Sequence, residues 1–311
     1  MGRTKTLVAT EQRNPRSRNL DQKSTREIIR IINREDAQVA AAVRREIPNV
    51  ARAVDEIAAR LRRGSRLFYI GAGTSGRLGV LDASEVPPTF GVPRTLVQGI
   101  IAGGNGALTS SIEGAEDHPE NGARDVRARG LRAGDAVVGI AASGSTPYVL
   151  GALQYARQRG AYTIALTTNR RTLVSRIAHL TIAPITGREV ITGSTRMKSG
   201  TAQKMVLNMI STATMTRLGY ILDNWMIGIA KSNEKLRKRA VRNLSEATGA
   251  DQPTAARILE QASGDLRVAL VMLKSGVDAH AARRSLAAHH DDVRKTLRDT
   301  GINGNRRGRN G

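Results

Sequence analysis

The sequence has no cysteine, and aromatic residues make up only 3% of its 311 residues. The lack of cysteine excludes disulfide bonds, thiolate nucleophiles and cysteine-based zinc sites, and it is typical of a reducing compartment. The longest apolar runs, such as Val268–Leu273, are much shorter than the roughly 20 residues that cross a bilayer. Residues 1–10 lack the apolar core of a secretory signal. We therefore expect a globular, cytoplasmic protein with no membrane partner.

Acidic residues are scarce beside basic ones, with 27 Asp+Glu against 49 Lys+Arg and a net charge of +22. A clustered excess of this size is typical of proteins that bind nucleic acid. Here the charge is spread, because residues 1–70, 71–230 and 231–311 carry +8, +6 and +8. Few aromatic side chains are present to stack on single strands. Nucleic acid is therefore not the expected partner.

Residues 1–60 form the first predicted part, an N-terminal helical segment. Ser24 and Glu27 have the spacing of a capping box, directly before an isoleucine-rich stretch. Residues 37–59 repeat apolar side chains every three to four positions, which predicts a helical face. Pro48 is expected to kink or interrupt that helix.

Residues 61–230 alternate short apolar strands with helical stretches, which predicts an α/β domain. This pattern is typical of a doubly wound, parallel five-stranded sheet with helices on both faces. Ligands of such sheets bind beyond the carboxyl ends of the strands. The predicted strands are Leu67–Ile70, Thr95–Ile101, Ala136–Ala141, Tyr162–Thr167 and Leu180–Ile185.

Residues 231–300 read as a small C-terminal helical bundle, and residues 301–311 as a disordered tail. Gly249, Gly264 and Gly276 are expected to end successive helices, and Asp278 to cap the last one. The tail consists mainly of glycine, asparagine and arginine, a composition that cannot bury a core.

Three loops of the predicted sheet domain combine glycine with serine and threonine. Taken alone, the first is compatible with a plain strand-to-helix turn. It is not a Walker loop, and no acidic residue ends a second strand as dinucleotide binding requires. Three such loops together suggest a cradle for a phosphorylated, polyhydroxylated ligand. The loops are Gly71–Arg77, Ala142–Pro147 and Thr192–Gly200.

Two carboxylates lie near these loops and are candidates for proton transfer. Glu85 precedes Pro87 and Pro88, which are expected to force the chain out of the helix. Glu116 lies in an acidic stretch after the second predicted strand. A carboxyl group in a partly dry cleft can shuttle protons, although a solvated surface charge is the ordinary role of a single glutamate. No histidine grouping suggests a metal site.

These motifs resemble the N-acetylmuramic acid 6-phosphate etherase family of the sugar isomerase (SIS) fold, over nearly the whole chain. Two positions depart from that family's pattern, with Val86 in place of a cysteine and Ser145 in place of an arginine. The matching stretches are Thr10–Asn14, Ile32–Asp36, residues 69–91, 113–117 (EGAED), 139–153, 192–212 and 232–242 (SNEKLRKRAVR).

The resemblance implies a flavodoxin-like strand order and a carbon–oxygen lyase of cell-wall amino-sugar recycling, without cofactor or metal. Such an enzyme converts N-acetylmuramic acid 6-phosphate to N-acetylglucosamine 6-phosphate and D-lactate by elimination and hydration. It implies Glu85 as proton donor or acceptor and Glu116 as its partner, with their division of labour left open. The substrate would be bound by Thr74, Ser75, Ser143, Ser145, Thr146, Ser194, Thr195 and Arg196, with Lys198 as a further cation.

The family also implies a homodimer whose sites are completed across the interface. Two other functions stay open on the sequence. One is an SIS-fold sugar-phosphate isomerase, which would share the phosphate cradle but release no lactate. The other is a non-catalytic, sugar-phosphate-sensing regulator.

Overall fold

The computed structural model describes residues 8–228 and 234–299. Internal contacts divide the chain into two compact units. The first contains Met1–Ser84 and Arg94–Thr212, and the second contains Glu85–Pro93 and Ala213–Gly311. Among the described residues, no helix is both long and apolar enough to cross a membrane.

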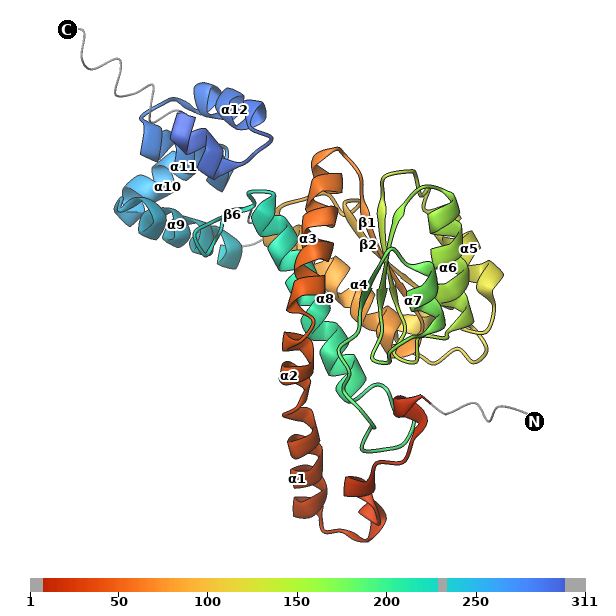
Figure 1. The fold of residues 1–311 in the computed structure, drawn as a ribbon. Helices are drawn as coiled ribbons and strands as arrows, with labels where there is room; N and C mark the ends of the chain where they lie inside the picture. The colour runs from red at the N-terminus through yellow and green to blue at the C-terminus, as the bar shows by residue number, and fades with distance from the viewer. Residues whose placement is uncertain (1–7, 229–233, 300–311) are drawn as a thin grey trace, which may run out of the picture. The chain divides into compact units, whose positions relative to one another are not determined.

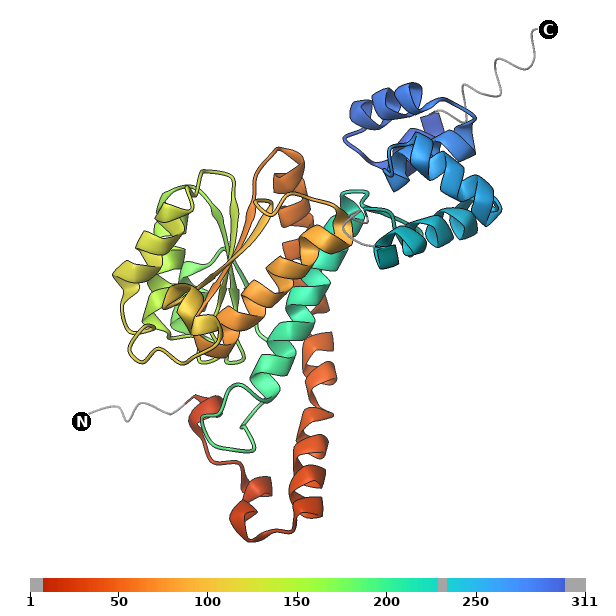
Figure 2. The same ribbon diagram turned by 180° about the vertical axis from the view of Figure 1, so that it is seen from behind.

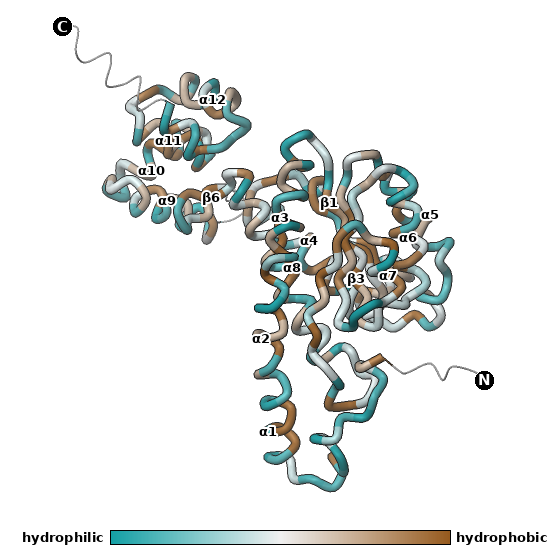
Figure 3. Tube along the Cα trace, viewed as in Figure 1, coloured by the Kyte–Doolittle hydropathy of each residue, from teal (hydrophilic) through white to brown (hydrophobic). Residues whose placement is uncertain are grey.

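The first unit is built on a five-stranded sheet whose strands all run parallel in the order β2-β1-β3-β4-β5. β1 and β3 are buried along their whole length, and they are among the most hydrophobic segments of the chain (Figure 3). The predicted parallel sheet and its strand order are therefore confirmed. The strands are β1 (Leu67–Gly71), β2 (Val97–Ile101), β3 (Ala136–Ile140), β4 (Tyr162–Leu166) and β5 (Leu180–Ile182).

Helices cover both faces of this sheet (Figure 1). α5 (Pro119–Ala128), α6 (Pro147–Gln158) and α7 (Leu173–Ile177) lie on one face. α3 (Ile47–Arg62), α4 (Gly73–Phe90) and α8 (Lys198–Arg217) lie on the other, as the view from behind also shows (Figure 2). A short 3₁₀ helix, η4 (Gly104–Leu108), follows β2. Short loops join the ends of β1, β3 and β4 to the starts of α4, α6 and α7.

The N-terminal residues belong to the same unit as the sheet. Three 3₁₀ turns precede α1, whose predicted capping box is present: Ser24 N donates to Glu27 Oε2 at 2.9 Å, and Glu27 N donates to Ser24 Oγ at 3.4 Å. Pro48 stands in the first turn of α3, so the expected interruption is confirmed. The elements are η1 (Ala9–Glu11), η2 (Pro15–Ser17), η3 (Leu20–Gln22), α1 (Thr25–Asp36) and α2 (Val39–Arg44).

The prediction that Pro87 and Pro88 end the helix is wrong, because α4 continues to Phe90 with both prolines inside it. The φ angle of proline is close to the helical value, so the backbone can continue. Each ring lacks the N–H that would bond one turn back, but Gly91 N still donates to Pro87 O at 2.9 Å. The last turn therefore closes in spite of the two missing donors.

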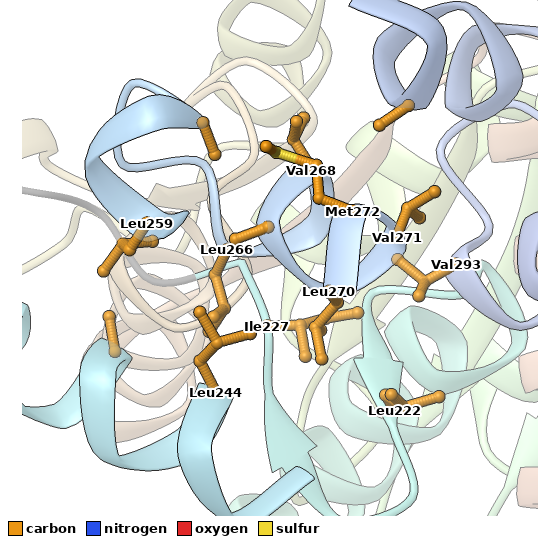
Figure 4. Close-up of a cluster of buried hydrophobic side chains, with 14 of the residues drawn as sticks. Leu222, Ile227, Leu244, Leu259, Leu266, Val268, Leu270, Val271, Met272 and Val293 are labelled. Atoms are coloured by element: carbon orange, nitrogen blue, oxygen red, sulfur yellow. The ribbon is translucent and has the colours of Figure 1, made fainter. Parts of the chain in front are cut away.

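The second unit is a helical bundle with a small antiparallel hairpin of β6 (Ile221–Leu222) and β7 (Trp225–Met226). Leucines 244, 266 and 270 lie in its buried apolar cluster (Figure 4). Gly276 ends α11 with φ of +65°, and Asp278 Oδ1 accepts from Ala281 N at 2.7 Å as the predicted cap. The predicted tail lies outside the described residues. The helices are α9 (Glu234–Thr248), α10 (Gln252–Gln261), α11 (Leu266–Ser275) and α12 (Ala279–Ala288).

Candidate active site

The loops that follow β1 and β3 lie on adjacent strands, at the point where the order of the sheet reverses. β1 pairs with β2 on one side and with β3 on the other, so the helical connections leaving β1 and β3 diverge to opposite faces. In sheets of this order, ligands bind beyond the carboxyl ends of these two strands. The structure therefore brings the first and second predicted loops together.

Glycines allow the first loop to turn back tightly against the end of β1. A side chain at Gly71 would meet Gly76 N at 2.7 Å, and one at Gly76 would meet Gly71 O at the same distance. Thr74 and Ser75 lie in the first turn of α4 and are partly exposed. The free N–H groups and the positive dipole end of a helix N-terminus favour an anion. This loop has the form of a phosphate-binding turn.

The second loop presents hydroxyl groups at the end of β3. Ser143 Oγ and Ser145 Oγ lie 3.1 Å apart, and Ser145 N donates to Ser143 Oγ at 3.3 Å. Gly144 has φ of +74°, and Thr172 occupies the space that its side chain would fill. Thr146 directly precedes α6 and is partly exposed. The three hydroxyl-bearing residues predicted here therefore stand together at a second helix start.

The third loop leads into α8 and lies beside the first loop. Gly200 N donates to Thr195 O at 3.0 Å, and a side chain at Gly200 would meet Thr74 Cγ2 at 3.4 Å. Ser194 and Thr195 are partly exposed and Arg196 is exposed. The structure thus places the first turn of α8 next to the first turn of α4.

Gln203 links these two helices in a way that the sequence did not predict. Ser75 Oγ donates to Gln203 Oε1 at 2.9 Å, and Gln203 is only 1% exposed. The bond orients the Ser75 hydroxyl and leaves its oxygen lone pairs as acceptors. Nothing in the helical pattern around Gln203 indicates this role, because it depends on how α4 packs against α8.

Lys198 is not a free cation for a ligand, which corrects the sequence-based suggestion. Its ammonium donates to Glu35 Oε2 at 2.6 Å, and the two residues are 1% and 2% exposed. Glu35 also accepts from Arg16 Nη1 at 2.9 Å and Asn14 Nδ2 at 3.0 Å. Burial alone would raise the pKa of the Glu35 carboxyl, but the three donors together hold that pKa below its ordinary value. Lys198 is therefore part of a buried ion pair.

A second buried carboxylate, Glu189, caps α8. Its Oε2 accepts from Lys198 N at 3.1 Å and its Oε1 accepts from Ser199 N at 2.9 Å, and the residue is fully buried. These are two of the N–H groups that a helix leaves without an intrahelical partner. Glu189 stands nine residues before the helix, so its capping role has no local sequence signature.

The two predicted catalytic glutamates are both exposed. Glu116 lies just before α5, and its carbonyl accepts from Tyr148 N at 3.0 Å in the first turn of α6. This backbone bond holds Glu116 beside the second loop. Glu85 lies on α4, beyond the turn that carries Thr74 and Ser75, and belongs to the second unit.

Asn169 is a further polar residue at the strand ends. It follows β4, donates from Nδ2 to Ala142 O at 2.9 Å and to Thr10 Oγ1 at 3.3 Å, and accepts from Ala9 N at 3.0 Å. The rule that marked the first two loops, polar residues directly after a buried strand, would also have marked Asn169. It connects the second loop to the N-terminal segment.

Histidine and carboxylate side chains do not gather into a metal-binding group anywhere in residues 8–228 and 234–299. His118 contacts Glu120 at 3.1 Å on the surface, and His179 stacks on Tyr162 with ring centroids 5.2 Å apart. These two histidines therefore have local structural partners.

The fold and the loops define a sugar isomerase (SIS) domain, the class to which two family models assign this chain. Residues 118–213 match the SIS domain model, and residues 49–157 match the glucokinase regulatory protein N-terminal SIS domain model. A similar solved structure, described as a phosphosugar isomerase involved in capsule formation from Bacteroides fragilis, aligns over 67% of this chain and 98% of its own, with a TM-score of 0.52 and 18% identity.

Curated relatives narrow the class to one family. An N-acetylmuramic acid 6-phosphate etherase of Symbiobacterium thermophilum is 58% identical over 87% of this chain and 90% of its own length. Those of Salmonella agona and Pectobacterium atrosepticum are 52% and 51% identical, each over 94% of this chain and over 98% and 96% of their own lengths. The chain belongs to the N-acetylmuramic acid 6-phosphate etherase family.

Proposed function

We propose that this chain cleaves the D-lactyl ether of N-acetylmuramic acid 6-phosphate, giving N-acetylglucosamine 6-phosphate and D-lactate. The observation that carries the proposal is the pair of hydroxyl-rich loops at the β1/β3 switch point, in a chain that is 58% identical to an etherase. The chain has no cysteine, which suits a cytoplasmic enzyme working on oxygen acids and hydroxyl groups.

The first two loops are the proposed phosphate and sugar site. Thr74 and Ser75 stand at the N-terminus of α4, and Ser143, Ser145 and Thr146 stand just before α6. Backbone N–H groups and hydroxyl donors at two helix starts suit a dianionic phosphate. We assign Ser194, Thr195 and Arg196 of the third loop to the same site. The exposed Arg196 guanidinium is the proposed partner of the lactyl carboxylate or the phosphate.

The reaction needs proton transfer more than charge neutralisation. In the open-chain aldehyde the C2 proton is acidic because it lies next to the carbonyl carbon. A base takes that proton, the electron pair forms the C2–C3 double bond, and the C3–O bond breaks with its electrons going to the lactate oxygen. That oxygen takes a proton from the catalytic acid. Water then adds its oxygen to C3 and a proton returns to C2. Glu85 and Glu116 are the proposed acid and base of these steps.

We also propose that the enzyme is a homodimer. Leu81 on α4 is 47% exposed and Met209 on α8 is 36% exposed. Their chain neighbours Asp82 and Asn208 are hydrogen bonded at 2.9 Å, so the two apolar side chains lie on adjacent helices. Glu85 follows Leu81 by one helical turn, which puts it on the same face of α4. A partner seated there would approach the proposed catalytic Glu85.

The test is to incubate the purified chain with N-acetylmuramic acid 6-phosphate and measure D-lactate with a coupled dehydrogenase. Glu116→Gln and Glu85→Gln should each lower kcat by at least about 10²-fold, the low end for acid–base catalysis. Glu120→Gln is the matched control, because Glu120 is a nearby, 69% exposed carboxylate that pairs with His118. Full activity in either test variant would refute its catalytic role, and phosphosugar isomerisation without lactate would favour the isomerase.

A further inference from the structure

The sequence stretches Thr10–Asn14 and Ile32–Asp36 take no part in the proposed chemistry, yet they meet at the start of α8. Glu35, from the end of α1, pairs with Lys198 at 2.6 Å inside the first unit. Asn14 donates from Nδ2 to Glu35 Oε2 at 3.0 Å and to Arg188 O at 3.2 Å. The N-terminal segment therefore contacts both the helix start and the chain that leads to it.

The same segment holds the beginning of the third loop. Gly193 N donates to Thr10 O at 3.0 Å, and the Thr10 hydroxyl accepts from Asn169 Nδ2 at 3.3 Å. Asn169 in turn donates to Ala142 O, in the first residue of the second loop. A continuous set of hydrogen bonds thus runs from the second loop through Thr10 to the third loop.

The third loop itself has little to fix its shape. Its residues before α8, 192–197, contain no strand or helix, and Arg196 faces solvent. Its internal hydrogen bonds are short-range, such as Ser194 N to Ile191 O at 3.0 Å. The chain that leads to the loop is also tied to the N-terminal segment, because Ser17 Oγ donates to Val190 O at 2.7 Å and Arg188 donates to Gln12 and Arg13. Within residues 192–200, the N-terminal segment holds Gly193 through Thr10 and Lys198 through Glu35.

We propose that Glu35 is a positioning residue: through its buried pair with Lys198 it sets the place of the third loop beside the first, and so tunes substrate binding. This inference rests on the proposed function. Lys198 cannot reach solvent without moving the first turn of α8, because it is 1% exposed and its own N–H is bonded to Glu189. An uncompensated ammonium at this site is strongly unfavourable, so it would pull that turn outward. Gln203, which accepts from Ser75, lies in the same helix, as does Gly200, where any added side chain would meet Thr74.

The test compares Glu35→Gln with Asp135→Asn, another buried carboxylate. Asp135 is 1% exposed and accepts from Arg66 Nη2 at 2.7 Å and Arg66 N at 2.8 Å, at the amino ends of β1 and β3. Both variants should lower the melting temperature, since each leaves a cation without its carboxylate. Glu35→Gln should raise KM about tenfold or more with a smaller change in kcat, because a displaced binding loop weakens ground-state contacts. Asp135→Asn should leave KM within twofold.

Amide hydrogen exchange gives a second readout that does not depend on activity. Residues 191–197 should exchange faster in Glu35→Gln than in wild type, and should be unchanged in Asp135→Asn. If Glu35→Gln does not fold, Lys198→Met takes its place, since Glu35 then keeps Arg16 and Asn14. The proposal is overturned if a folded Glu35 or Lys198 variant keeps both its KM and its exchange rates unchanged. It is also overturned if KM rises equally in Asp135→Asn. A wild-type chain that releases no lactate refutes the proposed function instead. The hydrogen-exchange measurement still decides whether Glu35 positions the third loop.

Discussion

Glu189 offers a quantitative test of how α8, and with it the third loop, is held. Glu189→Ala removes both acceptors of the Lys198 and Ser199 amides, which lie 3.1 and 2.9 Å from its carboxylate oxygens. Loss of a helix cap costs about 0.5–2 kcal/mol. Hydrogen bonds to a charged group contribute about 1.5–3 kcal/mol each, and both donors here lie in buried residues.

We therefore expect Glu189→Ala to lower the free energy of unfolding by about 3 kcal/mol. Glu189→Gln keeps one acceptor oxygen and should lose about half as much. Urea unfolding followed by circular dichroism at pH 7 measures both free-energy losses. The dependence of the unfolding free energy on urea concentration should be the same in all three proteins. A loss under about 0.5 kcal/mol for Glu189→Ala would refute the idea that this carboxylate secures the helix start.

Two further predictions concern α4. Asp82 is 5% exposed, and its Oδ1 accepts from Asn208 and Ser211. Burial raises the pKa of the Asp82 carboxyl. The stability that this shift contributes is therefore present below the pKa of the unfolded state and is lost as pH rises through the pKa of the folded state. The Asp82→Asn variant should therefore melt at least as high as wild type at pH 7, and its advantage in melting temperature should shrink toward pH 4. A variant whose melting temperature falls further below that of wild type at pH 7 than at pH 4 would contradict this direction of the pKa shift. Leu81→Asp should raise the dissociation constant of the proposed dimer more than tenfold in sedimentation equilibrium, because it puts a charge on an apolar contact surface, and an unchanged constant would remove Leu81 from the interface.

The sheet could be predicted because its strands are short, apolar and β-branched between glycine- and proline-containing turns. All five were located, and their ends differ by at most three residues. The largest difference is at β5, whose pairing with β4 begins at Leu180 and ends at Ile182. Pro184 follows within the predicted strand, and a proline cannot donate a ladder hydrogen bond.

The binding loops could be located for a similar reason, since parallel strands bring their carboxyl ends to one edge. The hydrogen-bond and ion-pair partners of the side chains in those loops could not be predicted from the sequence. Glu35 and Lys198 are 163 residues apart in sequence, and Ser75 and Gln203 are 128 apart. No local pattern distinguishes a lysine that binds an anion from one that is paired in the interior. The two prolines of α4 show that a local pattern can also mislead. They predicted the end of the helix, but the last helical turn closes around them and the helix continues.

The central claim is that this chain removes lactate by elimination followed by addition of water at C3. The most direct measurement is to run the reaction on N-acetylmuramic acid 6-phosphate in water enriched in oxygen-18 and to analyse both products by mass spectrometry. The account predicts one solvent oxygen at C3 of N-acetylglucosamine 6-phosphate and the original ether oxygen in D-lactate. Ether oxygen retained on the sugar, with solvent oxygen in the lactate, would contradict it.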